Sequence, residues 1–164
     1  MSDVRDEFAG LLARFTAAVE SGDTAAFVAL FCEDGVYEDI FYGAFRGPER
    51  LAEMLREHFH AHARDFRWEM REPVCDGRVG YANYIFSYSS TMARSAGRRV
   101  VFTGCSRFVL RDGLIESYTE WAYGTAGLAQ LGAPPSVLVR QAERESARIR
   151  SAADGSRHRL EGTT

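Results

Sequence analysis

The sequence predicts an α+β domain in which helices come first and a long antiparallel sheet follows. Two observations carry this prediction. Between positions 3 and 62 the apolar residues recur every three or four positions, which is the period of one helical face. Beyond position 64 they alternate with polar residues, and glycine turns separate runs rich in aromatic and β-branched residues. A curved sheet with helices across its hollow face would enclose an apolar pocket for a small ligand.

The first helix is expected over 3–21, because this stretch carries the clearest apolar face. Ser2 or Asp3 can cap its start, and Gly22 supplies the residue that ends it. Asp23 then caps a second, shorter helix that reaches residue 31.

A strand and a third helix come next. The turn residues at 33–35 are expected to lead into the strand, which ends near Asp39. Gly47 and Pro48 begin the third helix, since proline is favoured at the first helical position. The predicted buried stripe of this helix is Leu51, Met54, Leu55, His58, Phe59 and His62.

The sheet is expected to be completed by four further strands. They are predicted at 66–73, 78–91, 100–110 and 114–123. Turns fall at 76–77, around 96–97 and at 112–113, each with a glycine. Residues 1–132 would form the main domain and 133–150 a mostly charged helical extension, on the surface or against a partner chain. We expect 151–164 to be a mobile tail.

The composition excludes several classes of protein. With 164 residues, 46% of them hydrophobic, one domain with one core is expected. The formal net charge of -3 argues against a nucleic-acid surface, which needs clustered positive charge. No apolar run approaches the length of a membrane span, so no membrane is expected as a partner. Three cysteines without paired spacing favour a reducing cytoplasm.

Two adjacent acidic residues, Glu38 and Asp39, lie in an otherwise apolar and aromatic stretch at 35–47. In a strand neighbouring side chains point to opposite faces, so one of the two carboxylates faces the interior side. A carboxylate enclosed by aromatic rings loses solvation and its pKa rises, which prepares it for proton transfer. The alternative is that Asp39 starts a turn and Glu38 lies in water.

Glu120 is the second candidate acid, on the last predicted strand. If Glu120 and Asp39 faced one cavity, their repulsion would split their pKa values and assign one as acid and one as base. The alternative is a surface ion pair with Arg107 on the neighbouring strand. An inward Glu120 would place Trp121 on the outer sheet face, where a second copy of the chain would have to cover it. A homodimer through that face is therefore expected.

His58 and His62 lie four residues apart on the apolar face of the third helix. This spacing suits a metal, but no further ligand motif accompanies it, and no metal is predicted. A semi-buried histidine, or a pocket acid, base or ligand donor, is the other interpretation. Several tyrosines and a tryptophan have the amphipathic character that suits a pocket wall, although each could equally fill the core. They are Tyr37, Trp68, Tyr84, Tyr88 and Tyr118.

Four segments together resemble the SnoaL-like branch of the nuclear transport factor two-like superfamily. They are Arg-Phe-Thr-Ala-Ala-Val-Glu-Ser-Gly-Asp at 14–23, Gly-Val-Tyr-Glu-Asp at 35–39, Phe-Arg-Gly-Pro-Glu-Arg-Leu at 45–51, and the run from Phe-Thr-Gly-Cys-Ser to Ile-Glu-Ser-Tyr at 102–118. The resemblance covers roughly 4–132. It implies a conical barrel: a curved, mainly antiparallel sheet with three N-terminal helices over its concave face. It also implies frequent dimerisation through the sheet.

The resemblance implies more than one activity, because the superfamily holds polyketide cyclases, ketosteroid isomerases, limonene epoxide hydrolases, dehydratases and binding proteins. Asp39 matches the general base of ketosteroid isomerases, although Ile40 replaces their proline. Their oxyanion tyrosine falls on Phe15, and their oxyanion aspartate near Cys105 or Ser106, so those donors are missing. Limonene epoxide hydrolases have an aspartate on the last strand that helps to activate water, and Glu120 stands near that position in this sequence. SnoaL-like cyclases need one pocket acid or base with a nearby histidine, which Asp39 and His58 can supply.

The leading hypothesis is a cytoplasmic, dimeric enzyme that moves a proton on a small hydrophobic carbonyl or hydroxyl compound, as a cyclase, isomerase or dehydratase. No cofactor is expected. The catalytic candidates are Asp39, His58 and Glu120. The substrate-binding candidates are Phe15, Tyr37, His62, Trp68, Tyr84 and Tyr118. The rivals are a non-catalytic ligand-binding or assembly module and an epoxide hydrolase of the limonene type, the latter if Glu120, Asn83 and Tyr84 converge on one water.

Overall fold

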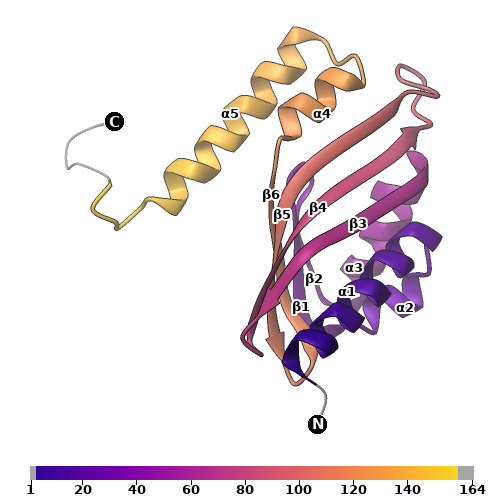
Figure 1. Cartoon of the computed structure of the whole chain (residues 1–164). Helices are drawn as coiled ribbons and strands as arrows, with labels where there is room; N and C mark the ends of the chain where they lie inside the picture. The colour runs from indigo at the N-terminus through magenta and orange to yellow at the C-terminus, as the bar shows by residue number, and fades with distance from the viewer. Residues whose placement is uncertain (1–2, 159–164) are drawn as a thin grey trace.

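The computed structural model describes residues 3–158. Three helices come first, interrupted by two strands, then four long strands and two more helices (Figure 1). In chain order these are α1 (Val4–Ser21), α2 (Thr24–Val28), β1 (Phe31–Asp39), β2 (Gly43–Arg46), α3 (Gly47–Glu53), the π-helix η1 (Met54–His60), β3 (Ala63–Cys75), β4 (Val79–Ser90), β5 (Arg99–Arg111), β6 (Leu114–Ala122), α4 (Gly124–Gln130) and α5 (Pro135–Ala152). The α+β plan is confirmed.

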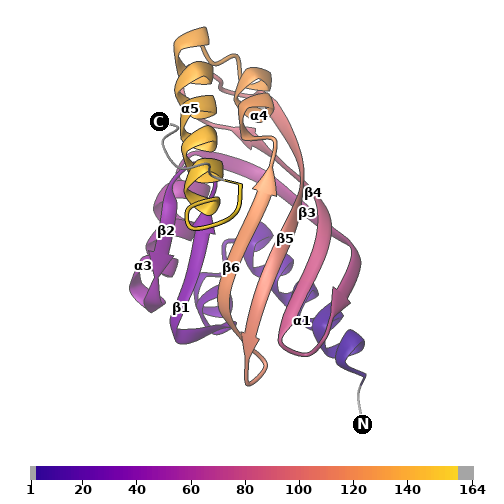
Figure 2. The ribbon, with the colours of Figure 1, turned by 90° about the vertical axis from the view of Figure 1, so that its left-hand side faces the viewer.

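One curved, unclosed sheet of six strands organises the domain, in the order β2-β1-β6-β5-β4-β3. All neighbours are antiparallel except β1 and β6, which run parallel. The helices α1, α2 and α3 cover one side of this sheet, and α5 lies on the other (Figure 1). Seen from that other side, β6 and β5 run up the middle of the sheet beside α5 (Figure 2). The curved sheet under three N-terminal helices matches the cone expected from the sequence.

The core lies between α1 and the concave face of the sheet. Phe15 on α1 is fully buried, and its ring packs against Tyr118 and Trp68 at centroid distances of 5.3 and 5.2 Å. Phe8 on the same helix meets Phe108 edge to face at a centroid distance of 5.6 Å. Such aromatic pairs stabilise a core beyond the area that they bury. The apolar face of the first helix therefore packs against the sheet, as predicted.

The first strand begins earlier than the sequence suggested. The residues at 33–35, expected to form a turn before the strand, lie inside β1, and the second helix ends at Val28. The turn signal instead marks a shift of register between Phe31 and Val36 against β6. Gly35 is needed there, since an added Cβ would lie 2.8 Å from the carbonyl oxygen of Cys32. A bulge in a strand uses the same residue types as a turn, which explains the difference.

The third helix changes its winding halfway along. After α3 the chain continues as the π-helix η1, in which the Ala61 N–H donates to the carbonyl of Arg56, five residues back, at 2.9 Å. Phe59 is buried, His58 is half-buried and His62 is exposed, so only part of the predicted stripe is buried. His60 faces α1, where its Nε2 lies 2.8 Å from the carbonyl oxygen of Val19.

After β6 the chain continues as the helices α4 and α5. In α5 only Gln141 is buried, which agrees with a mostly charged surface helix. This helix runs to Ala152, so the first residues of the predicted tail belong to it, whereas 159–164 lie outside the described residues. Within 3–158 no helix is long and apolar enough to cross a membrane.

Candidate active site

A cavity of about 80 Å³ lies between the concave face of the sheet and η1. Its walls are mostly aromatic, and two carboxylates, Asp39 and Glu120, reach them from neighbouring strands. The lining residues that the site uses are Tyr37, Asp39, Tyr42, His58, Phe59, His62, Phe66, Trp68, Tyr84, Phe86, Tyr88, Met92 and Glu120. The described lining holds no arginine, so the two histidines, His58 and His62, are the only side chains in it that can carry a positive charge.

Asp39 is the last residue of β1, and the strand alternation turns it inward while Glu38 points out. Its side chain is 5% exposed. Oδ1 accepts the backbone N–H groups of Phe41 and Tyr42 at 2.7 and 2.9 Å. Burial raises the pKa of Asp39, and these hydrogen bonds, with the nearby His58, oppose that rise. Both earlier interpretations are thus partly correct: Asp39 starts a turn, and it is also enclosed.

Glu120 on β6 faces the same cavity and is held by phenols. Its Oε2 accepts from the Tyr84 hydroxyl at 2.6 Å and from the Tyr118 hydroxyl at 3.1 Å. The Tyr118 hydroxyl also shares a hydrogen bond with Ser106 at 2.9 Å. Burial, and next the charge of Asp39, raise the pKa of Glu120 to about 7, against the two tyrosine hydrogen bonds. The surface ion pair with Arg107 that we considered is wrong.

Space for the Tyr84 phenol comes from a glycine on the next strand. Gly104 pairs with Tyr84, and a Cβ added to Gly104 would lie 2.7 Å from the Tyr84 hydroxyl oxygen. It would also meet the backbone oxygen of Trp121 at 2.4 Å. Any side chain at this position would therefore displace the group that holds Glu120.

The cavity wall carries hydrogen-bonding groups that the described residues leave unused. No described group binds Asp39 Oδ2 or Glu120 Oε1. On the donor side, the Tyr37 hydroxyl and the Trp68 indole N–H are buried without a hydrogen-bond partner within 3–158. Burial raises the pKa of Tyr37 well above its ordinary value, and the neighbouring Tyr118 hydroxyl opposes that rise only in part. Buried polar groups are normally satisfied, so a ligand is a natural partner for all four.

His58 and His62 lie at the rim of the cavity. The His58 ring packs against Tyr42 and Phe45 at centroid distances of 4.7 and 5.2 Å, and its Nε2 is 3.8 Å from Glu53 Oε1. His62 lines the cavity from an exposed position. Over 3–158 no group of three or more His, Cys, Asp or Glu side chains could hold a metal ion.

The structure brings most of the predicted site residues together. Phe15 is not among the lining residues, because it is fully buried in the core. Tyr118 does not line it either, but it contacts Glu120. Sequence reasoning missed the roles of Ser106 and Gly104. Ser106 had a detectable signal, since it is the only hydroxyl residue on the inward, otherwise apolar row of β5.

The site and fold define a class of protein: an α+β cone with an acidic pair in an aromatic cavity. The sequence model of the SnoaL-like domain matches residues 12–118, and the chain belongs to that family. This agrees with the nuclear transport factor two-like superfamily suggested by the sequence. A search of the curated proteins gave no match.

Many solved structures share the fold. A protein with a ketosteroid isomerase-like fold from Catenulispora acidiphila DSM 44928, in complex with trimethylamine, has a TM-score of 0.68 at 18% identity, over 76% of this chain and 93% of that one. A protein assigned as a polyketide cyclase from Xanthomonas campestris pv. campestris has a TM-score of 0.66 at 23% identity, over 79% of this chain and 99% of that one. An LEH-like epoxide hydrolase from M. tuberculosis has a TM-score of 0.63 at 21% identity, over 77% of this chain and 90% of that one. At these identities the likeness concerns the fold.

Proposed function

We propose that the protein is an enzyme that moves a proton on a small, mostly apolar carbonyl or hydroxyl compound, in the manner of an isomerase, cyclase or dehydratase. One observation carries the proposal: Asp39 and Glu120 lie buried in one aromatic cavity with different hydrogen-bond partners. Pairs of acids whose surroundings push their pKa values apart are how enzymes obtain an acid and a base near neutral pH. Three free cysteines suit the reducing cytoplasm that we propose as its location.

The two carboxylates take different roles because different donors hold them. Two backbone N–H groups stabilise the ionised form of Asp39, which makes it the base. Glu120 has only phenol donors and a pKa near 7, so it holds a proton for part of the time at neutral pH and is the acid. His58 at the rim is the alternative second proton carrier.

The unused groups of the wall suit a carbonyl compound. Asp39 would take a proton from the carbon next to the carbonyl, and the resulting enolate oxygen would accept hydrogen bonds from Tyr37 and Trp68. These donors would replace those that the comparison with ketosteroid isomerases found missing at Phe15 and Cys105. Glu120 would give its own proton to another atom of the substrate, and exchange with water would then remove the proton from Asp39 and restore the one on Glu120. The small cavity and its exposed rim at Tyr42 and Met92 favour a compact ligand with one end at the surface.

The epoxide hydrolase alternative has less support. It required Asn83 to join Glu120 and Tyr84 around one water, but the Asn83 amide donates to Glu72 at 2.9 Å from an exposed position. A binding module without catalysis remains the rival. It would explain the cavity but would leave the separate environments of the two carboxylates without a role.

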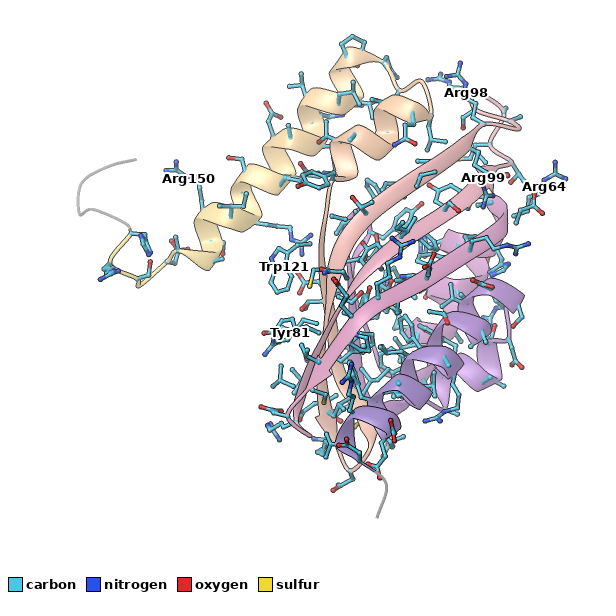
Figure 3. The ribbon with its side chains drawn as sticks, viewed as in Figure 1. Arg64, Tyr81, Arg98, Arg99, Trp121 and Arg150 are labelled. Atoms are coloured by element: carbon cyan, nitrogen blue, oxygen red, sulfur yellow. The ribbon has the colours of Figure 1, made fainter. Side chains whose placement is uncertain are left out.

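We further propose a homodimer through the outer sheet face. Trp121 and Tyr81 both point away from the core on that face (Figure 3) and are 60% and 38% exposed. Large exposed aromatic side chains on one face mark an interaction surface. Light scattering should give twice the chain mass for the wild type and for Val4→Arg, which changes an exposed residue on α1. Trp121→Arg should be a monomer; a monomeric wild type would contradict the dimer.

Exchange of hydrogen for deuterium on small cyclic ketones tests the proposed chemistry without knowledge of the product. In D₂O the wild type should exchange protons next to the carbonyl of a compound such as cyclohexanone, followed by NMR. Asp39→Asn should slow this exchange by about 100-fold, the usual contribution of a general base. Asp76→Asn is the matched control, because Asp76 forms the same kind of turn far from the cavity.

Two outcomes are decisive. Equal exchange in wild type and Asp39→Asn would remove Asp39 as the base. No exchange with any ketone, although ketones change the fluorescence of Trp68 in the cavity, would favour the binding module. Circular dichroism of each variant checks that it has folded.

A further inference from the structure

The sheet separates beside the two carboxylates. Paired residues of β1 and β6 end at Tyr37 and Tyr118, two positions before Asp39 and Glu120. Beyond this point β1 pairs only with β2 on its other side, where Asp39 faces Gly43. Within the described sheet the wall of the cavity therefore lacks pairing between β1 and β6 at the position of the acids, although Asp39 still pairs with β2 and Glu120 with β5.

The helix α5 covers this separation from the outer side (Figure 2). A groove of about 600 Å³ lies between them, lined by Glu38 and Trp121 from the sheet and by Glu145, Arg148 and Ile149 from the helix. Ile40 and Glu120 line both this groove and the inner cavity. The two spaces thus share a wall made of these two residues.

Two side chains of α5 hold the residues on either side of Asp39. Arg148 Nη2 donates to Glu38 Oε1 at 3.1 Å, and Gln141 Nε2 donates to the carbonyl oxygen of Ile40 at 3.4 Å. Gln141 is only 4% exposed and also donates to Glu145 at 3.2 Å. Glu145 in turn accepts from the backbone and hydroxyl of Thr125 at the start of α4. The contacts form a continuous clamp from α4 to the Asp39 turn.

We infer that α5 is part of the active site, with Gln141 and Arg148 as positioning residues that fix the Asp39 turn and supply a permanent positive charge close to the two acids. The inference rests on the proposed roles of the two acids and extends the site to a helix beyond the matched family domain. Gln141 acts on geometry, because it binds the carbonyl of the Ile40–Phe41 peptide, whose N–H donates to Asp39. Arg148 acts on charge, because the cavity lining contains no guanidinium.

The charge of Arg148 lowers the pKa of both Asp39 and Glu120. Around Asp39 the other titratable groups are His58 on η1, Tyr42 in the turn, Tyr88 on β4 and Glu120. Around Glu120 they are Asp39 and Tyr37 on β1, Tyr84 on β4 and Tyr118 on β6. Arg148 itself is ion-paired with Glu38 on β1 and shares the groove with Glu145 on α5. Of all these groups His58 and Arg148 can carry a positive charge, and Arg148 keeps its charge at every working pH.

Titration of Glu120 tests the role of Arg148 without any substrate. The carbonyl stretch of protonated Glu120, identified by infrared difference against Glu120→Gln, should disappear at higher pH in Arg148→Gln than in the wild type. Arg150→Gln is the control, because Arg150 lies two residues along α5 and points away from the sheet (Figure 3). Ketone exchange on the acid side of the pH profile should fall about threefold in Arg148→Gln, since less Asp39 is ionised there. An unchanged Glu120 titration would overturn the charge role.

Hydrogen exchange tests the role of Gln141. The amides of Phe41 and Tyr42, which hold Asp39, should exchange about tenfold faster in Gln141→Leu, while the amides of Arg78 and Val79 at Asp76 should be unchanged. Equal amide exchange rates of Phe41 and Tyr42 in the wild type and in Gln141→Leu would overturn the positioning role of Gln141. These measurements hold even if no ketone is turned over, so failure of the clamp and failure of the proposed chemistry are separable.

Discussion

Asp39 and Asp76 form the same turn in two different surroundings. In each, Oδ1 accepts the backbone N–H groups two and three residues on: at 2.7 and 2.9 Å for Asp39, and at 2.8 and 2.7 Å for Asp76. Asp76 lies exposed in the β3–β4 turn, and these hydrogen bonds lower its pKa. Asp39 lies in the cavity, and its pKa is raised.

The difference teaches that burial outweighs two good hydrogen bonds in this protein. Loss of hydration disfavours the charged carboxylate, whereas backbone N–H groups favour it. Glu120 extends the comparison, because it is equally buried and lacks backbone donors. The pKa is thus lowered in Asp76 and raised in Asp39 and Glu120, and the causes can be tested by removing one group at a time.

The largest expected effect concerns Glu120 and the pH dependence of stability. A carboxyl with a pKa near 7 in the folded state and about 4.5 when unfolded binds a proton more tightly in the folded protein. Its contribution to stability is complete below the unfolded pKa and is lost as the pH rises through 7. The wild type should lose about 2.5 kcal/mol of unfolding free energy between pH 5 and 8 from this group. Urea unfolding across this range measures the loss.

Glu120→Gln should remove most of this dependence of the unfolding free energy on pH, because glutamine cannot ionise but can still accept a hydrogen bond from Tyr84. A smaller slope of the same sign should remain from Asp39, whose pKa is also raised. If the variant and the wild type lost equal stability over this range, Glu120 would not carry the proposed proton.

A smaller effect is expected from Tyr84, which donates to Glu120 at 2.6 Å. Tyr84→Phe removes a hydrogen bond that favours the ionised form, so Glu120 should titrate at higher pH. Ketone exchange should fall about tenfold at neutral pH, as is usual when one group that supports proton transfer is lost. Tyr88→Phe is the matched control, since Tyr88 lines the same cavity without a hydrogen bond to Glu120. Equal rates in the two variants would show that the Tyr84 hydroxyl is not needed.

Much of the fold could be predicted from the spacing of apolar residues along the sequence alone. The strands β4 and β6 differ from the predicted ranges by at most one residue at either end, and α1 differs by one at its start. The inward position of Asp39 and of Glu120 follows from strand alternation, which also predicted that Trp121 would be exposed. Local pattern suffices where one face of an element is buried and the other is solvated.

Other features depend on contacts that no local pattern records. Phe15 was placed in the pocket because its position matches a pocket residue in a related family, but here its ring packs under Tyr118. The clamp from α5 depends on Gln141 reaching a peptide 101 residues away, in a helix whose charges indicate only a surface position. The bulge at Gly35 has the residue types of a turn, so the sequence predicted the wrong start for β1.

The smallest effect completes the comparison at Asp76. Its lowered pKa means that this group adds stability above its ordinary pKa and loses it as the pH falls through the lowered folded value. Asp76→Asn keeps an oxygen that can accept from Arg78 and Val79 but removes the charge. The urea midpoint of the variant should therefore lie slightly below that of the wild type at pH 7, and the two should converge near pH 2.

Asp39→Asn should show the opposite sign, because its carboxylate is disfavoured by burial. At pH 8 this variant should be at least as stable as the wild type, and the difference should shrink as the pH falls and Asp39 takes up its proton. Two identical turns would then respond in opposite directions to the same substitution. If both variants shifted the midpoint in the same direction, hydrogen bonding rather than burial would control the ionisation of Asp39, and the base in the cavity would lose its physical basis.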